Sequence, residues 1–375
     1  MKKMKINQVE SGMVLGKAIY NEDETIELLA KNTKLNERHI GLLENSGISE
    51  VYILDESEKE SKVVKDVSFE DFDHIVTNVV NQNMQINKLT GEGNKPIDER
   101  NLESINDTKD IFEKIVQKET IDIKSVEENV HKMLPDMIRN NDVLMRLDQL
   151  KKYDNYTFEH SLRVSILAAN IGKWFGYPKE IVEELAQAGL LFDIGKMKLP
   201  ESILKNKNDL TEAQMEVYQK HPQMGYNVLL KTPGTSKGIK YTCLQHHENV
   251  DGTGYPLRLR GGQIHQYAKI VSVCHVFDEL ISEKPYGKGL SKIQAYEYLN
   301  WNTNTKFDAT VVYVFLKKIS EYMIAKKVIL NNGKKGKIIY NNTNFPTKPT
   351  VRLNSGQIID LSKTKNLKIT KIIER

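Results

Sequence analysis

Two kinds of hydrophobic spacing alternate along this chain of 375 residues. In its first part, residues 14–20 and 51–54 are short apolar runs of the kind that form strands. Residues 36–45, which lie between them, have the spacing of a helix. The charged segment 56–66 follows neither period. We therefore expect a small α+β module over residues 1–60 that ends in a linker.

Apolar residues recur at helical spacing throughout the middle of the chain. Residues 61–150 show this spacing on both sides of a polar segment at 90–96, and the densest helical pattern occupies residues 151–326. We expect the first stretch to be a helical linker region and the second to be a helical domain. The strongest helices of that domain are expected at 157–174, 180–191 and 264–282.

Individual residues indicate where helices of this domain begin. Thr211 and Gln214 have the spacing of a capping box, in which each side chain accepts a hydrogen bond from the other's backbone N–H. Pro222 disfavours helical geometry at the residue before it and suits a first helical turn. His221 is therefore expected at a joint between helices, where ligand-type side chains from several helices can converge.

Strand-like spacing returns after residue 326. Short apolar runs at 328–330, 338–340, 350–353 and 358–361 are separated by segments that contain Asn, Gly and Pro. A small β module is therefore expected over residues 327–375. The chain as a whole should be mainly α, with a helical domain flanked by an α+β module and a β module.

Composition limits the class of protein. Hydrophobic residues make up 39% of the chain and the net charge is +4, which is ordinary for a globular protein and does not indicate nucleic-acid binding. Lysine pairs such as Lys334-Lys335 are expected on solvated faces. No apolar run is long enough to span a membrane. The two cysteines, Cys243 and Cys274, do not form a disulfide framework, so we expect a cytoplasmic protein.

Histidines gather in the helical domain. His246 and His247 are adjacent and precede the Gly-rich run 251–256, and two neighbours on one helix cannot both face an apolar core. Imidazoles and carboxylates are the ligands that hold divalent ions in sites that hydrolyse phosphodiesters. The candidate metal ligands are His160, Asp193, His221, His246, His247 and His275.

These motifs resemble those of the HD-GYP branch of the HD phosphohydrolases. The resemblance rests on His160-Ser161, Phe192-Asp193 before Ile194-Gly195-Lys196, His221-Pro222, His246-His247-Glu248, the run Asp-Gly-Thr-Gly-Tyr-Pro at 251–256, and Lys284-Pro285-Tyr286. It covers about residues 150–325 and implies a helical HD-type bundle. It also implies hydrolysis of the bacterial second messenger cyclic di-GMP, with divalent ions, commonly iron or manganese, as the cofactor.

The resemblance implies roles for single residues as well. Asp193 would bridge metal ions, while Lys196 and Lys284 would contact substrate phosphates, so that Asp193 and Lys196 are the catalytic candidates. Gly254 would admit a phosphate against backbone N–H groups or serve the turn itself. Tyr255 would stack on a base or pack in the core. The expected ligand is cyclic di-GMP or a related nucleotide, and a signalling protein is a candidate partner.

The family's pattern is incomplete in this chain. The dyad that names the family is His-Asp, and here Phe192 stands before Asp193, where it cannot coordinate an ion. An Asp of a later helix is replaced by His275, and Tyr156 stands where some members have an acidic ligand. Lys284 replaces an Arg, which keeps the charge but loses the two-pronged hydrogen bonding of a guanidinium.

If Asp193 bridges two ions, as the resemblance implies, the ligands divide between two ion positions. The first position then keeps all of its ligands, which are Asp193, His221, His246 and His247. The second relies on His160 and His275 together with the shared Asp193. One or two ions are therefore expected, and a two-ion hydrolysis is the less favoured case. Asp278, one turn after His275, is a candidate to orient that imidazole.

Functions of different class fit this pattern. The chain is a cyclic di-GMP phosphodiesterase with an impaired or rewired metal site, or a non-catalytic receptor or adaptor that binds the nucleotide or a protein. A third reading is an HD phosphohydrolase that acts on another nucleotide. Phe192 favours the receptor, whereas the retained histidine pair and Gly-Tyr-Pro turn favour a working pocket.

Overall fold

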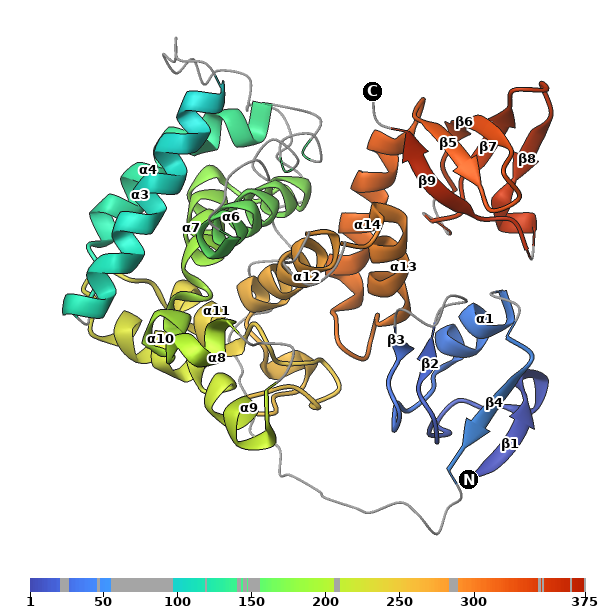
Figure 1. Ribbon diagram of the computed structural model, residues 1–375, viewed down its shortest axis with the longest axis horizontal. Coiled ribbons are helices and arrows are strands. Elements are labelled where there is room, and N and C mark those ends of the chain that lie inside the picture. The colour runs from blue at the N-terminus through green and yellow to red at the C-terminus, as the bar shows by residue number, and fades with distance from the viewer. Residues whose placement is uncertain are drawn as a thin grey trace. The chain divides into compact units, whose positions relative to one another are not determined.

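The computed structural model describes most of the chain as two compact units (Figure 1). The described residues are 1–20, 27–45, 48–54, 97–118, 120–139, 143, 147, 156–205, 210–282, 289–342, 345, 347–364 and 366–373. The first unit comprises Met1–Ser68, Leu290–Thr305 and Leu316–Arg375, and the second comprises Phe69–Gly289 and Lys306–Phe315. The segments 56–66 and 90–96, expected as linker and loop, lie outside the described residues.

The second unit is helical and is built around α6, Tyr156–Trp174. All residues of α6 from 159 to 172 are buried, as is typical of a helix at the centre of a domain. α6 packs on α7 (Lys179–Leu191), α12 (Gln266–Ile281) and α4 (Ile123–Arg139). The polar side chains of α6 are buried with the apolar ones and therefore need partners inside the unit.

Further helices belong to this unit. They are α3 (Ile97–Lys118), η3 (Ile194–Lys198), α8 (Glu201–Lys205), α9 (Glu212–Tyr218), α10 (His221–Leu230), α11 (Lys237–Gln245), η4 (Gly261–Gln263) and the first part of α14 (Ala309–Met323). The capping box of Thr211 and Gln214 is present at the start of α9. His221 is the first residue of α10, followed by Pro222, so both expected helix starts are confirmed.

The N-terminal part of the first unit combines two small sheets with one helix. β1 (Lys2–Lys5) pairs with β4 (Glu50–Ile53), β2 (Ile19–Tyr20) pairs with β3 (Glu27–Leu29), and α1 spans Glu37–Asn45. Their shared core includes Leu15, Leu29, Leu43 and Trp301, the last residue of α13 (Lys292–Trp301). Trp301 thus brings a distant part of the chain into this module.

The strand expected at 14–20 is wrong over most of its length. Val14 and Leu15 make isolated bridges, and regular pairing begins at Ile19. The backbone N–H of Leu15 donates to the carbonyl of Thr33, and the backbone N–H of Gly16 donates to the carbonyl of Tyr52. Successive residues therefore pair with different segments, and no continuous strand forms here. The strand Lys2–Lys5 was missed because lysines dominate it.

The C-terminal part is an antiparallel sheet of five strands in the order β8-β7-β6-β5-β9. The strands are β5 (Lys327–Leu330), β6 (Lys335–Tyr340), β7 (Thr350–Leu353), β8 (Ile358–Asp360) and β9 (Ile369–Ile373). The expected fold class, a helical domain with an N-terminal α+β module and a C-terminal β module, is confirmed. The three expected domain boundaries, at residues 60, 150 and 326, stay a prediction. None of the described helices is long and apolar enough to cross a membrane.

Gly195 allows η3 to lie directly against α10, and this contact is testable. A Cβ at residue 195 would meet the carbonyl oxygen of His221 and lie 2.6 Å from the backbone N of Gly225. Because backbone atoms cannot move aside as a side chain can, Gly195→Ala should lower the free energy of unfolding by about 2 kcal/mol or more. Guanidinium denaturation would measure this loss.

Gly41→Ala in α1 is the matched control. A Cβ at residue 41 would have nothing within 4 Å, and Ala is a better helix former than Gly by about 1 kcal/mol. The control should therefore unfold at the same or a higher denaturant concentration than the wild type. Equal unfolding midpoints for Gly195→Ala and the wild type would contradict the close packing of η3 on α10.

Candidate metal centre

Four side chains converge where α7, α10 and α11 begin or end. Asp193 follows α7 and precedes η3, His221 is the first residue of α10, His246 caps the end of α11, and His247 comes next. One ligand atom of each residue lies within 4.8 Å of the others. We refer to Asp193, His221, His246 and His247 as the first cluster.

The central atoms of the first cluster lie close together, and the tautomers of the two imidazoles decide whether their contacts are hydrogen bonds. Asp193 Oδ1 lies 3.3 Å from His221 Nε2 and 3.6 Å from His246 Nε2, and these two nitrogens are 3.4 Å apart. Asp193 Oδ1 and His247 Nε2 are buried atoms that lack a hydrogen-bond partner. Unsatisfied buried polar atoms are rare in folded proteins, and several at one point indicate a missing ligand.

The imidazoles of His221 and His246 use their protons for other partners, so none is left for a hydrogen bond among these central atoms. His221 Nδ1 donates to the carbonyl of Tyr218 at 2.7 Å, and His246 Nδ1 donates to the carbonyl of Cys243 at 2.9 Å. A neutral imidazole has one N–H, so both Nε2 atoms direct a lone pair toward Asp193. Three acceptors thus face one another. A divalent cation satisfies all three, and the first cluster therefore fits such an ion.

Charge around Asp193 supports the same conclusion. Burial by itself would raise the pKa of the Asp193 carboxyl, but the ammonium of Lys196, ion-paired with Oδ2, holds that pKa well below its usual value. Burial lowers the pKa of His221 to about 4 and that of His247 well below its usual value. At neutral pH Asp193 is therefore a carboxylate and His221 and His247 are neutral imidazoles, the protonation states that metal ligands require.

The turn after His247 holds that imidazole in place. The Tyr255 ring stacks on His247 with ring centroids 4.6 Å apart and an angle of 18° between the planes. Glu248 fixes the far side of the turn, because its carboxylate accepts from the backbone N–H groups of Leu257 at 2.6 Å and Leu259 at 2.9 Å. A Cβ at Gly254 would lie 2.5 Å from the carbonyl of His247, so only glycine permits this approach.

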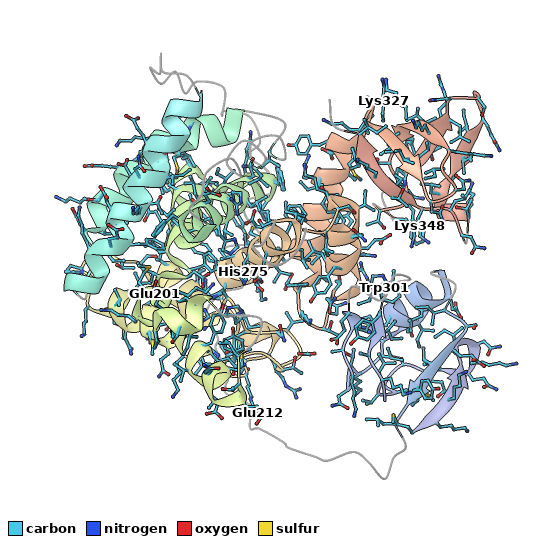
Figure 2. All side chains as sticks on the ribbon, viewed as in Figure 1. Glu201, Glu212, His275, Trp301, Lys327 and Lys348 are labelled. Atoms are coloured by element: carbon cyan, nitrogen blue, oxygen red, sulfur yellow. The ribbon has the colours of Figure 1, made fainter. Side chains whose placement is uncertain are left out.

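A second group of polar side chains joins α6 to α12. His160 Nδ1 lies 2.7 Å from Asp278 Oδ2, and His160 Nε2 lies 2.9 Å from His275 Nδ1. Arg163 donates from Nε to Asp278 Oδ1 at 2.8 Å and also pairs with Glu159 at 3.1 Å. We call His160, Arg163, His275 and Asp278 the His160 network. All four are buried, and His275 is marked in Figure 2.

This network corrects the role expected for Asp278. We expected Asp278 to orient His275, but its carboxylate contacts His160 and Arg163 instead. Asp278 lies one turn from His275 on the face of α12 that packs against α6, and the α6 side chains are within direct reach. His275 contacts the imidazole of His160 through Nδ1, and its Nε2 lies 3.7 Å from the carboxylate of Glu279.

Phe192 lies between the first cluster and the His160 network. It is fully buried, and its ring centroid is 4.9 Å from that of His246, 5.1 Å from His275 and 5.6 Å from His160. His160, Asp193 and His275 nevertheless have ligand atoms within 4.8 Å of one another. The aromatic ring supplies apolar packing where the family's dyad supplies a histidine.

The structure brings all six expected metal ligands into one region of the helical unit. Lys196 and Tyr255 lie beside them, and Gly254 lies in the adjoining turn. Lys284 and the side chain of Tyr156 are outside the described residues. Sequence reasoning missed Arg163 and Glu159. Their signal was two charged residues inside the apolar pattern of α6, a pattern that requires them to be paired.

Comparisons with known proteins agree with this site. Residues 135–311 match the family model described as HD domain. "Cyclic di-GMP phosphodiesterase PA4108" of Pseudomonas aeruginosa is 34% identical over 59% of this chain and 53% of that protein. "Cyclic di-GMP phosphodiesterase PdeB" of Borreliella burgdorferi is 30% identical over 55% of each chain. "3'3'-cGAMP-specific phosphodiesterase 1" of Vibrio cholerae is 29% identical over 44% of this chain and 39% of that protein.

These findings identify the helical part of the chain. Residues 135–311 match the HD domain model, and the similarity to proteins named cyclic di-GMP phosphodiesterases agrees with the resemblance to the HD-GYP branch that the motifs indicate. The chain spans about half the length of the curated relatives it matches, or less. A group of His and Asp residues that can hold a metal ion is present, as expected.

The low pKa of His221 predicts how the stability of the metal-free protein depends on pH. As pH falls, the unfolded chain binds a proton at His221 near the usual pKa of 6.5, while the folded chain resists until about 4. Stability therefore decreases as pH falls through this window, by about 2 kcal/mol between roughly pH 7 and pH 5 from His221 alone. Denaturant unfolding in the presence of a chelator would measure it.

Two variants separate this contribution from general acid effects. His221→Gln has no imidazole at this position, so its stability should depend less steeply on pH. The control His131→Gln changes a histidine whose side chain is 58% exposed, and it should keep the wild-type dependence. A wild-type slope in His221→Gln would show that His221 is not neutral in the folded state.

Proposed function

We propose that this chain is a cyclic di-GMP phosphodiesterase of the HD-GYP type whose metal centre holds one divalent ion and is catalytically weakened. The observation that carries the proposal is the convergence of three acceptors, Asp193 Oδ1 and the Nε2 atoms of His221 and His246, on one point. The relatives named cyclic di-GMP phosphodiesterases support the substrate. The proposal includes a cytoplasmic location for the protein.

The first cluster would hold the ion. Its donors are one carboxylate and up to three imidazoles, a set that suits iron or manganese. When bound, such an ion neutralises charge on a phosphodiester and lowers the pKa of water. The carbonyls that accept from Nδ1 of His221 and His246 fix these rings, and the stacked Tyr255 fixes His247. The ligands are therefore already in place before an ion binds.

A second ion is opposed by the His160 network. In the hydrogen bond between His160 Nε2 and His275 Nδ1, one nitrogen carries the proton and the other uses its lone pair. Both atoms would have to give up this bond to bind an ion. Asp278 and Arg163 hold His160 in position from the other side, and Phe192 offers no ligand in exchange. One ion is therefore the stable state.

The other residues of the site act on the substrate directly. Lys196 lies beside Asp193 with its side chain 13% exposed, so its ammonium can contact a phosphate oxygen while it balances the carboxylate. Lys284 has the second phosphate-contacting role that the resemblance implies. Hydrolysis adds water across one phosphodiester bond and yields the linear dinucleotide. With a single ion, the leaving oxygen lacks one of its two stabilising charges, and turnover should be slow.

A non-catalytic receptor is the second candidate function. The observation that favours it is Phe192, which fills the space between the two groups of histidines with an apolar ring. In that case the site binds cyclic di-GMP and transmits its presence to a signalling protein, without hydrolysis. A relative named for 3'3'-cGAMP makes that nucleotide the alternative ligand to test.

Metal content tests the single-ion site without any assay of activity. The wild type, loaded anaerobically with iron(II) or manganese(II) and desalted, should contain one ion per chain by plasma mass spectrometry. His246→Ala should lose it, because the variant lacks one of the three acceptors that converge on the ion position. His160→Ala should keep it. The exposed His131→Ala is the control and should match the wild type.

Restoring the family's residues should change both stoichiometry and rate. Phe192→His combined with His275→Asp adds a ligand and an anion, and it removes the imidazole pair that opposes a second ion. We expect two ions per chain and turnover of cyclic di-GMP at least about tenfold faster, measured by chromatography of the linear product. A wild type that binds one ion and cyclic di-GMP but forms no product would favour the receptor instead.

A further inference from the structure

The C-terminal sheet separates apolar from basic side chains by face. Alternate residues of its strands point inward and form a buried face, which consists of Val328, Leu330, Ile338, Val351, Leu353 and Ile369. The residues between them point outward. Five exposed cations share this outer side, namely Lys327, Lys335, Lys337, Arg352 and Lys371. We call these five residues the basic face, and Figure 2 marks Lys327.

The register of the strands places the cations of the basic face next to one another. Lys327 on β5 lies opposite Lys337 on β6, and Lys337 lies opposite Arg352 on β7. On the other side of this row, Ile329 lies opposite both Lys335 and Lys371. Like charges directly opposite each other destabilise a sheet. The stability of the fold therefore does not account for this arrangement. The cations lie on four adjacent strands and so form a two-dimensional array.

The charge is concentrated in this module. Residues 327–375 contain eleven Lys and Arg and two Asp and Glu, a net charge of +9 against +4 for the whole chain. Among the described residues of the module, the acidic side chain is Asp360, whose Oδ2 lies 3.5 Å from Lys363 Nζ. Asp360 lies opposite Thr350 at the edge of the sheet and not within the rows of the basic face.

Aliphatic side chains stand between these cations. Ile358 is opposite Arg352 and is 57% exposed, and the partly buried Ile329 and Ile373 lie opposite Lys335 and Lys327. The exposed aromatic residues Tyr340 and Phe345 follow Ile338 and lie outside the opposed pairs of the basic face. A single strand of nucleic acid would need aromatic rings for its bases along the track of cations itself. A two-dimensional array of cations with exposed isoleucine instead matches a plane of anionic headgroups above an apolar layer.

We infer that the basic face docks this protein on the surface of a bilayer that contains anionic phospholipids. Lys327, Lys335, Lys337, Arg352 and Lys371 contact headgroup phosphates, and Ile358 enters the boundary between headgroups and acyl chains. Such binding is peripheral, and it is independent of the metal centre. Lys335, from the lysine pair Lys334-Lys335 that was expected on a solvated face, is one of the residues that contact the lipid.

Vesicle binding by the full-length chain tests this inference. We expect flotation with phosphatidylcholine vesicles that contain about one third phosphatidylglycerol, loss of binding on pure phosphatidylcholine, and weakening as salt is raised. The triple variant Lys327→Gln, Lys337→Gln, Arg352→Gln should need about 10- to 100-fold more lipid, since each cation near an anionic surface contributes roughly fivefold. Ile358→Gln should weaken binding while keeping its salt dependence.

The matched control removes the same charge elsewhere. Lys2→Gln, Lys31→Gln, Lys114→Gln changes three exposed lysines outside the C-terminal sheet and should bind as the wild type does. Thermal unfolding of the basic-face variant should be no lower than that of the wild type, because like charges have been separated. Equal binding to neutral vesicles, equal loss in the control, or binding to single-stranded RNA or DNA in place of vesicles would overturn the inference.

Discussion

The buried carboxylate of Asp193 is the constraint around which the helical unit is organised. It lies between α7 and η3, and a buried anion is stable only where cations or hydrogen-bond donors surround it. Here Lys196 supplies one charge, while two imidazoles present lone pairs because their protons are engaged by backbone carbonyls. The remaining acceptor capacity is what makes the site fit a divalent ion.

The neighbouring His160 network links α6 to α12 beside the first cluster. Phe192 packs against His160 and His275, and these two imidazoles contact each other at 2.9 Å. The ion pair of Arg163 with Asp278 then determines their orientation. His160, Asp193 and His275 nevertheless have ligand atoms within 4.8 Å of one another, as do the residues of the first cluster.

Much of the fold and of the site could be predicted from local patterns. The buried helix α6, the capping box at Thr211 and the joint at His221 each depend on residues within one or two turns, where sterics and backbone hydrogen bonds decide the outcome. Other features could not be predicted. The partner of Asp278 is 118 residues away on α6, and the first strand is rich in lysine, so its pairing with β4 decides its conformation.

The sequence by itself determined which chemical groups are available: the imidazoles, one shared carboxylate, a phenylalanine at the dyad position and an excess of cations near the C-terminus. Only the tertiary structure decided how these groups act on one another. Packing of α12 on α6 joined His160 to His275, backbone carbonyls fixed which imidazole nitrogens carry lone pairs, and strand register set Lys327, Lys337 and Arg352 side by side. Charge and hydrogen bonding depend on distances of a few ångströms, and these are set only when distant segments pack together.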